Sequence, residues 1–237
     1  MKFNILSDIR DLFLPPVCPV CGSTIAEGAH TICNRCRIET PLTGFCFRFD
    51  NPVVRKFWGV VPVVNASSFI FFVRDSGFRE LIHDFKYDGL WKTALEMGRW
   101  YGSELARSGL YNDIDIIIPI PLHLRRRLKR GYNQSEYIAR GISKATGIGI
   151  DTRSVRRIRH NPSQTHQNVR ERWDNVKGIF AVRHPERLRG KHILLVDDVL
   201  TTGATLISCS ETILKAVPDA RISIATLAVS RSHIELA

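Results

Sequence analysis

One segment, from Ile193 to Thr205, limits the fold of this chain more than any other. It opens with the apolar run Ile-Leu-Leu-Val, which has the length of a strand, and continues with Asp197, Asp198 and the string Thr-Thr-Gly-Ala-Thr. Apolar residues at helical spacing follow from Leu206 onward. In an open α/β sheet, ligands bind beyond the carboxyl ends of the strands. The segment therefore predicts a buried strand, a ligand-binding turn and a helix.

The residue types in this turn suit a phosphate monoester. A helix N-terminus offers unpaired N–H groups and a partial positive charge, and Gly203 lets the backbone approach an oxygen without a Cβ in the way. The expected phosphate-binding residues are Thr201, Thr202, Gly203, Ala204 and Thr205. Because Asp197 and Asp198 repel a phosphate, they fit the hydroxyls of an attached sugar, or a divalent cation that bridges them to a second phosphate.

The segment has two other possible interpretations. An apolar strand that ends in Asp also occurs in nucleotide triphosphatases, but these need the phosphate loop G-x-x-x-x-G-K-[ST], and the chain contains no such string. A strand that ends in a solvated acidic turn and caps a helix explains one Asp and one Thr. It does not explain the whole segment, so a site for a phosphorylated sugar is the preferred interpretation.

The rest of the chain alternates between strand and helix patterns. Strands are expected at Val60 to Val64, Ser68 to Val73, Asp115 to Ile120, His192 to Val196 and Arg221 to Val229. Helices are expected around Leu81 to Phe85, and at Leu90 to Leu105, Gln134 to Ala145 and Leu206 to Val217. Alternating elements with continuous apolar strands predict an α/β fold with a mainly parallel sheet flanked by helices on both faces. The polar stretch from Arg153 to Lys177 is expected to be an irregular loop, either a flap over a site or a solvated insertion.

Five of the six cysteines lie within the first 50 residues, which differ in character from the rest. Cys18-x-x-Cys21 and Cys33-x-x-Cys36 form two knuckles at a spacing close to that of zinc ribbons. Met1 to Leu14 reads as an amphipathic helix and not as an export signal, so the expected compartment is the cytoplasm, where thiols stay reduced. The four knuckle cysteines are therefore the expected ligands of a structural Zn²⁺. We expect residues 1–50 to form this module and residues 51–237 to form the main domain.

The other two cysteines are not expected to bind metal. Cys46 lacks a C-x-x-C partner, and Cys209 falls on the inward stripe of a predicted helix, where a small core residue is expected. The longest apolar runs are also far shorter than the roughly 18 residues that a membrane-spanning helix needs, so no membrane insertion is expected.

The chain carries 34 Lys and Arg against 23 Asp and Glu, a formal charge of +11. The excess is concentrated at Arg125 to Arg130 and again from Arg153 to His160. A polyanion is an expected partner, either nucleic acid or a smaller phosphorylated substrate. A basic surface that only keeps the protein in solution is the remaining alternative.

Ile193 to Thr205 resembles the phosphoribosyl-pyrophosphate (PRPP) signature of type I phosphoribosyltransferases. The wider sequence is similar to the competence protein F (ComF) family. The similar segments are Ile118 to His123, Arg126, Arg130 to Gln134, Pro162 with Gln164 and Thr165, Glu171 with Arg172, Asn175 with Val176, and the cysteine module. Two positions depart from the family pattern: Gln167 stands where Leu is usual, and Leu128 stands where a basic residue is common.

The resemblance implies a type I phosphoribosyltransferase fold behind an N-terminal zinc ribbon. It implies that Thr201 to Thr205 hold the 5-phosphate and that the catalytic acids Asp197 and Asp198 hold the ribose hydroxyls. Arg126 and Arg130, after the turn at Pro121, would face the pyrophosphate with Mg²⁺, and Gln164 and Arg172 would belong to a loop that closes over the site. No general base stands out, although His123 and His166 are candidates.

Three functions remain open at this point. The chain could be a pentosyltransferase that uses PRPP and is linked to DNA uptake in natural competence, with an acceptor that the residues do not reveal. It could instead be a competence factor that binds single-stranded DNA and other competence proteins through a non-catalytic scaffold. A nucleotide-salvage phosphoribosyltransferase is the third alternative, although no aromatic pair that could clasp a base is evident.

Overall fold

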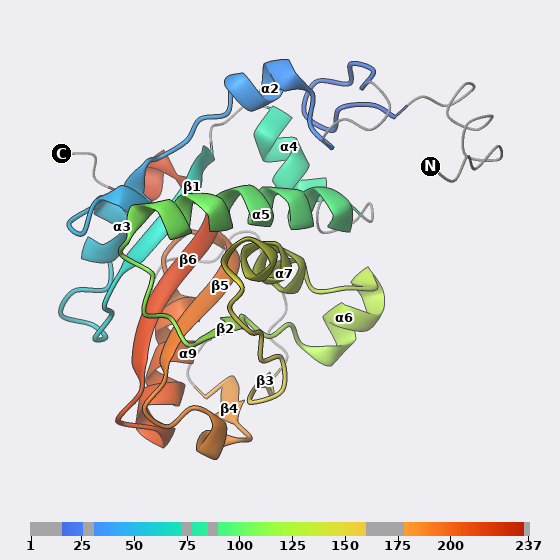
Figure 1. The fold of residues 1–237 in the computed structure, drawn as a ribbon. Helices are drawn as coiled ribbons and strands as arrows, with labels where there is room; N and C mark the ends of the chain where they lie inside the picture. The colour runs from blue at the N-terminus through green and yellow to red at the C-terminus, as the bar shows by residue number, and fades with distance from the viewer. Residues whose placement is uncertain (1–15, 26–30, 73–76, 85–89, 160–177, 235–237) are drawn as a thin grey trace.

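The computed structural model describes residues 16–25, 31–72, 77–84, 90–159 and 178–234 (Figure 1). The expected helix at Met1 to Leu14 and most of the expected flap, with Gln164, His166 and Arg172, lie outside these residues. Phe85 does as well. Among the described residues, no helix combines the length and the apolar character needed to cross a bilayer.

A four-stranded parallel sheet forms the centre of the molecule, as predicted. Its strands lie in the order β1 (Ala66–Phe72), β6 (Arg221–Ser230), β5 (His192–Leu200) and β2 (Ile116–Pro119). β2 pairs with β5 from Ile116 opposite Ile193 to Pro119 opposite Val196. β5 runs past the predicted end at Val196 and includes both acids, with Asp197 opposite Thr226 of β6. The acid pair therefore lies at the carboxyl edge of the sheet.

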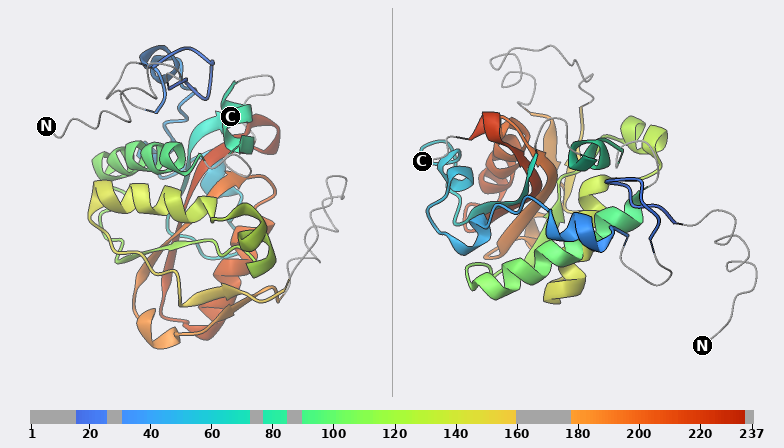
Figure 2. Two further views of the ribbon diagram at one scale, coloured as in Figure 1. Left: turned by 90° about the vertical axis from the view of Figure 1, so that its right-hand side faces the viewer. Right: turned by 90° about the horizontal axis from the view of Figure 1, so that it is seen from above.

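Helices cover both faces of this sheet, which confirms the expected layering (Figures 1 and 2). α5 (Trp91–Ser108) and α7 (Gln134–Thr146) pack against one face, where Leu194 and Val196 of β5 are buried. α9 (Ala204–Ala216) and the short α3 (Pro52–Arg55) pack against the other, where Ile193 and Leu195 are buried. Successive side chains of β5 therefore face opposite sides of the sheet, and both sides are covered, as expected for a strand that is apolar throughout this part.

α5 and α7 approach each other closely because glycines line their contact. A Cβ at Gly98 would lie 2.3 Å from the carbonyl oxygen of Ile138, and one at Gly141 would lie 2.1 Å from that of Leu95.

The remaining elements are α2 (Asn34–Ile38), η1 (Phe45–Phe47), α4 (Gly77–Asp84), α6 (Leu124–Arg130), β3 (Val155–Arg157), β4 (Phe180–Val182), η2 (Pro185–Arg187) and η3 (Arg231–His233).

Two local predictions were wrong. Val60 to Val64 is not a strand: residues 56–60 form turns after α3, and the amides of Val60 and Val61 both donate to the carbonyl oxygen of Phe57. Gly59 supports this turn with a φ of +73°. The stretch expected to be irregular contains β3, which pairs antiparallel with β4. Because Arg156 and Arg157 are charged, this short strand has no apolar pattern by which it could be predicted.

Candidate functional site

The acid pair ends β5 beside the first turn of α7. Oδ1 of Asp197 accepts hydrogen bonds from Oγ of Ser135 at 2.8 Å and from the amide of Asp198 at 2.9 Å. Oδ1 of Asp198 accepts from the amide of Val199 at 2.7 Å. Both acids are partly buried. The side chain of Asp197 is thus held from two directions at the carboxyl edge of the sheet.

This environment changes the acidity of Asp197. Burial, followed by the neighbouring charge of Asp198, raises its pKa to about 7. The hydrogen bonds from Ser135 and Asp198 and the positive charge of Arg157 act in the opposite direction. Asp197 therefore changes its charge near neutral pH, as groups in functional sites often do.

The turn after β5 keeps its backbone donors available. Gly203 has a φ of +80° and begins α9, whose N-terminus has no side-chain cap. The amide of Ala204 lies 3.5 Å from Oγ1 of Thr202. Within the part of the chain that the structure describes, the amides of residues 202, 203, 205 and 206 have no hydrogen-bond partner. These amides are the donors that an anion would need.

A small hollow of about 30 Å³ brings the predicted residues together. It is lined by Asp197 and by the backbone and side chains from Val199 to Leu206, which include Thr201, Thr202, Gly203, Ala204 and Thr205. An anion bound by the amides of this turn would therefore lie beside a carboxylate that can accept hydrogen bonds. That combination suits a ligand with a phosphate at one end and hydroxyl groups next to it.

The residues after β2 approach the same edge of the sheet, but less directly. Asn133, the residue before α7, donates from Nδ2 to the carbonyl oxygen of Ile120 at 3.0 Å. Arg130 reaches the first turn of α7, where its Nη1 lies 3.5 Å from Oε1 of Gln134. Nδ1 of His123 accepts from the amide of Arg125 and caps α6. The side chain of Arg126 lies outside the described part of the structure.

Sequence reasoning missed Ser135. Its contact with Asp197 joins residues 62 positions apart in the chain, so no local pattern indicates it. Its position in the chain could still have indicated the contact. Ser135 lies in the first turn of a helix that follows a neighbouring strand, and such helices begin at the carboxyl edge of a parallel sheet.

The four knuckle cysteines form a second site. The Sγ atoms of Cys18, Cys21, Cys33 and Cys36 all lie within 4.8 Å of one another, and those of Cys21 and Cys33 are 3.7 Å apart. Zn–S bonds of about 2.3 Å in a tetrahedron place the sulfur atoms about 3.8 Å apart. The amide of Cys33 lies 3.4 Å from Sγ of Cys18, as expected for an amide that faces a thiolate. The cluster could bind a metal ion such as zinc.

The cysteine cluster is attached to α5 and α4. Oε2 of Glu96 accepts from the amide of Thr31 at 2.6 Å, and its Oε1 accepts from Nη1 of Arg37 at 3.2 Å. The guanidinium of Arg37 also lies 4.6 Å from the ring centroid of Trp100. Gly77 of α4 lies so close to Val20 that a Cβ there would meet the carbonyl oxygen of Val20 at 1.9 Å. Cys46 and Cys209 are buried in the core and lie outside the cluster, as expected.

Comparison with known proteins agrees with this geometry. The family described as "Phosphoribosyl transferase domain" matches residues 128–236, which contain α7, β5, the turn and α9. The chain therefore carries a phosphoribosyl transferase domain. Together with the four-cysteine cluster and the relatives below, this places the chain in the ComF/YhgH family. The resemblance noted from the sequence is confirmed.

Three relatives illustrate the family. The DNA utilization protein YhgH of Salmonella typhi is 29% identical over 138 residues, which are 57% of this chain and 60% of that protein. Competence protein F of Haemophilus influenzae is 32% identical over 102 residues, 43% of this chain and 44% of that protein. Competence protein ComFC of Bacillus subtilis is 26% identical over 214 residues, 89% of this chain and 77% of that protein. The chain thus matches less than two thirds of the length of the Salmonella relative.

Proposed function

We propose that this protein binds PRPP together with Mg²⁺ and transfers the phosphoribosyl group to an acceptor. One observation carries the proposal: the acid pair adjoins, at one edge of the sheet, a turn in which four amides have no hydrogen-bond partner among the described residues. PRPP has the matching features, because its 5-phosphate and its ribose hydroxyls are neighbours on one small molecule. A lone anion would explain the amides but not the acids.

Each part of the substrate has a partner in this proposal. The amides of residues 202, 203, 205 and 206, with the threonine hydroxyls, bind the 5-phosphate. The hydrogen bonds to Asp197 within the described residues both go to Oδ1, so Oδ2 is available to a ribose hydroxyl. Asp198 binds the second hydroxyl. The acids hold the sugar and do not act on the phosphate.

The pyrophosphate end would lie toward α6 and α7. Mg²⁺ would be bound together with PRPP, and its charge, with those of Arg126 and Arg130, would stabilise the negative charge that grows on the departing pyrophosphate. Arg130 already reaches the first turn of α7. Gln164 and Arg172 are proposed to help exclude water from the site, since water would hydrolyse the substrate.

Calorimetric titration of the full chain with PRPP and MgCl₂ tests this proposal. The wild type should bind, and an Asp197→Asn/Asp198→Asn variant should lose at least tenfold in affinity, because two charge-assisted hydrogen bonds are weakened. Asp113→Asn is the matched control, because Asp113 lies at the opposite edge of the sheet near His192. Absence of binding by the wild type would end the proposal.

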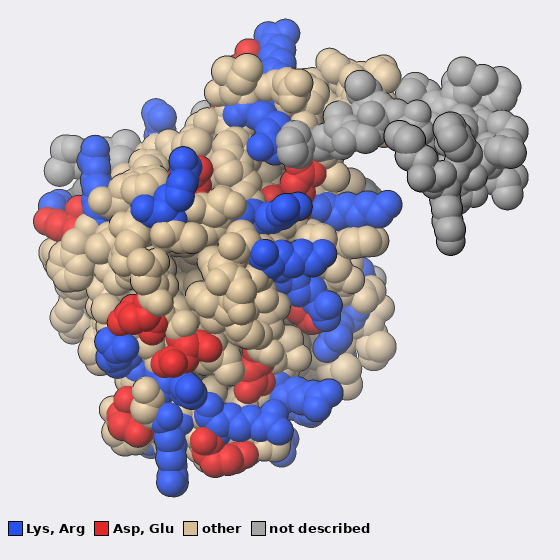
Figure 3. Space-filling model, viewed as in Figure 1, with Lys and Arg blue, Asp and Glu red and all other residues tan. Residues whose placement is uncertain are grey.

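A role in DNA handling is the second candidate, supported by the names of the relatives and by the charge of α6. Arg125 and Arg127 of this helix are exposed, and basic side chains are frequent on the side of the molecule that carries α6 (Figure 3). Single-stranded DNA would be the partner, with other competence proteins as further partners. Replacing both arginines by Ala should weaken binding of a fluorescent oligonucleotide and reduce its salt dependence by about one unit per lost phosphate contact. Unchanged affinity would argue against this role.

We also propose that the cysteine cluster binds a structural Zn²⁺. All four positions are filled by sulfur, which leaves no open position for a substrate. Two ligands are buried and one is exposed, so the metal would hold a small surface module together. Measurement of one zinc per chain in purified protein, and its loss in Cys21→Ser, tests this assignment.

A further inference from the structure

A row of aromatic side chains lies where α5, α6 and α7 come together. The ring centroid of Tyr137, near the start of α7, lies 5.5 Å from that of Tyr132 and 5.4 Å from that of Trp91. Tyr132 follows the end of α6, and Trp91 is the first residue of α5. We call these three side chains the aromatic row.

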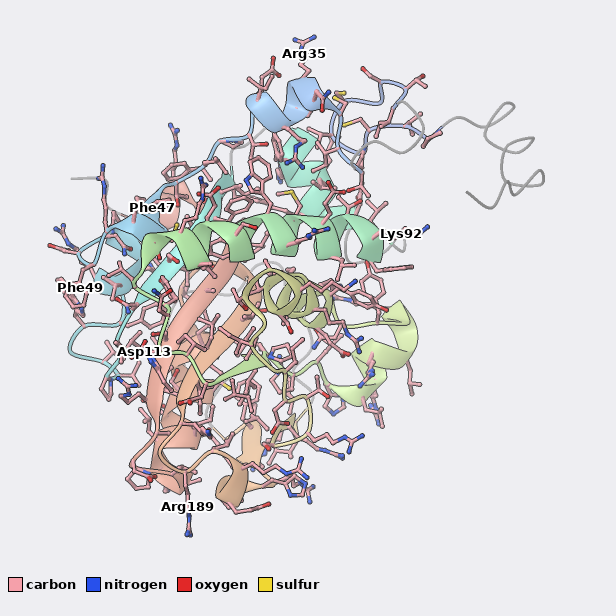
Figure 4. The ribbon with its side chains drawn as sticks, viewed as in Figure 1. Arg35, Phe47, Phe49, Lys92, Asp113 and Arg189 are labelled. Carbon is pink, nitrogen blue, oxygen red and sulfur yellow. The ribbon has the colours of Figure 1, made fainter. Side chains whose placement is uncertain are left out.

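The close packing of α5 against α7 produces this row. Gly141 of α7 packs against the carbonyl oxygen of Leu95 of α5. Tyr137 and Trp91 each lie four residues earlier in their helices, about one turn toward the start, so the same packing brings their rings together. In Figure 4, Lys92 marks this start of α5, on the side of the molecule that carries α6.

The packing leaves the aromatic row open to solvent. Trp91 keeps 39% of its surface exposed, and Tyr132 and Tyr137 are half-buried. An indole that only joined two helices would be covered by them, because burial of its large apolar surface is what makes an aromatic side chain stabilise a fold. The exposed part of Trp91 is therefore a surface for a ligand.

Positive charges lie beside the rings. Nζ of Lys92 lies 5.7 Å from the ring centroid of Trp91, and the guanidinium carbon of Arg140 lies 5.7 Å from that of Tyr137. Both side chains are exposed. A ligand that lay on the rings would thus have a cation at its edge on each of the two helices.

The aromatic row adjoins the basic helix α6. Oε1 of Glu136 accepts from Nη2 of Arg140 at 2.7 Å, and its Oε2 lies 3.9 Å from Nη2 of Arg127 of α6. One carboxylate is therefore set against two arginines, and the surface stays positive. Arg125 of α6 is exposed as well, so the charges of α6 and the rings form one continuous surface.

Aromatic rings bordered by cations suit a strand of unpaired nucleotides. Each base offers a flat face that can stack on an aromatic side chain, and the phosphates between the bases bind Lys and Arg. In a duplex, the bases already stack on one another, so the same rings could not reach them. An isolated phosphate or a small acid would explain the cations and would not use the exposed indole.

We propose that the aromatic row is a stacking platform for the bases of single-stranded DNA, with Trp91 as its main contact and with Lys92 and the arginines of α6 and α7 on the phosphates. The inference rests on the proposed role in DNA handling, and it adds the surface that contacts the bases. Stacking does not distinguish one base from another, so the platform would accept strands of any sequence.

Fluorescence anisotropy of the full chain with two labelled strands tests the inference. One strand is an oligothymidylate, and the other has the same length and the same phosphates but lacks the bases. Trp91→Ala should bind the oligothymidylate about tenfold more weakly than the wild type, a loss that corresponds to about 1.4 kcal/mol, and should bind the abasic strand equally well. Its salt dependence should not change, because no phosphate contact is lost.

Trp58→Ala is the matched control. This indole is also exposed, at 49%, but it follows α3 on the other face of the sheet. Trp58→Ala should bind both strands as the wild type does. A second measurement uses fluorescence: the oligothymidylate should quench the tryptophan emission of the wild type, and Trp91→Phe should lose this quenching while it keeps most of the affinity, since a phenyl ring still stacks.

Two results would overturn the stacking platform: unchanged affinity of Trp91→Ala for the oligothymidylate, or an equal loss with the abasic strand. Either result would leave the role in DNA handling standing, since the wild type would still bind both strands through the charges of α6. Failure of the wild type to bind either strand would instead remove that role and the platform with it. The binding of PRPP is measured separately and does not depend on these outcomes.

Discussion

Oγ of Ser135 donates a hydrogen bond of 2.8 Å to Oδ1 of Asp197 and thereby joins the first turn of α7 to the acid at the end of β5. Asp197 accepts a second bond on the same oxygen from the amide of Asp198. The two donors hold the carboxylate in one orientation and leave Oδ2 to a ligand. Ser135 is therefore a positioning residue for Asp197.

We predict that Ser135→Ala weakens the binding of PRPP with Mg²⁺ by about tenfold, because a hydrogen bond to a charged group contributes about 1.5–3 kcal/mol. Ser135→Thr retains the hydroxyl and should restore most of the affinity. Calorimetry measures both variants. Ser143→Ala, on a later turn of the same helix, is the control for loss of a hydroxyl from α7. Equal affinity of Ser135→Ala and the wild type would show that the bond does not position Asp197.

The binding of PRPP should depend on pH through Asp197. The pKa of this acid is raised to about 7, first by burial and then by Asp198, and only the ionised carboxylate accepts hydrogen bonds on both oxygens. Affinity should therefore rise as the pH increases from about 5.5 to 7 and level off above 8. In Asp197→Asn this part of the pH dependence should be absent. Calorimetry at several pH values, with corrections for the ionisation of PRPP itself, checks the prediction.

Stability should change with pH in the opposite direction. The folded protein favours the protonated form of Asp197, since its pKa rises from 3.8 in the unfolded chain to about 7. The contribution of Asp197 to the free energy of unfolding is therefore most favourable below pH 3.8, and it is lost as the pH rises from 3.8 through 7. The free energy of unfolding of the wild type, relative to Asp197→Asn, should fall by at most about 1.4 kcal/mol per pH unit in that window. Urea unfolding at pH 5, 6 and 7 measures this slope. A difference in unfolding free energy between the wild type and Asp197→Asn that does not change with pH would contradict a raised pKa of Asp197.

The backbone of Gly203 provides another test. Its φ of +80° is a conformation that costs an L-residue about 1–2 kcal/mol, whereas a Cβ would meet no atom closer than 3.6 Å. Gly203→Ala should therefore strain the turn without a steric clash, and binding of phosphate or PRPP should weaken. Gly147→Ala is the matched control, because Gly147 has a φ of +77° at the end of α7 with no neighbour within 4 Å. Both variants should lose similar stability in urea, and only Gly203→Ala should lose affinity.

The regular part of the fold could be predicted from hydrophobic spacing alone. β2 and the first half of β5 are continuous apolar runs, β6 is mostly apolar, and α5, α7 and α9 carry apolar stripes, so each element is found within a few residues of its expected place. Hydrophobic spacing gave a wrong prediction at Val60 to Val64, where the positive φ of Gly59 supports a turn in place of the expected strand. It also failed at α6, whose sequence LRRRLKR lacks a buried stripe: Leu124 and Leu128 are both exposed.

The candidate site also has a part that could be predicted from the sequence and a part that could not. The string from Asp197 to Thr205 is continuous in the chain, so its residues could be expected to lie together, and all of them except Asp198 line one hollow. Contacts between distant segments could not be foreseen. Ser135 reaches Asp197 from another helix, and a second hollow is lined by residues of α6 and of β3. Arg157, whose positive charge acts on Asp197, lies in β3, within a stretch that was expected to be irregular.

Metal removal should destabilise more than the cysteine module. Cys18 and Cys36 are buried in the same core cluster as Leu81 of α4 and Met97 of α5, and Glu96 ties the module to α5. Treatment with a chelator should lower the melting temperature of the full chain by at least about 4 °C, equivalent to about 1–2 kcal/mol. Differential scanning calorimetry gives the shift. Cys21→Ser should melt at the lower temperature without chelator and should not respond to it, and an unchanged melting temperature in treated wild type would contradict a structural metal.

The most direct test is a crystal structure of the wild-type protein with PRPP and Mg²⁺. We expect the 5-phosphate within hydrogen-bond distance of the amides of residues 202, 203, 205 and 206, and a ribose hydroxyl on Oδ2 of Asp197. A 5-phosphate bound elsewhere, or a ribose that does not touch Asp197 or Asp198, would contradict it.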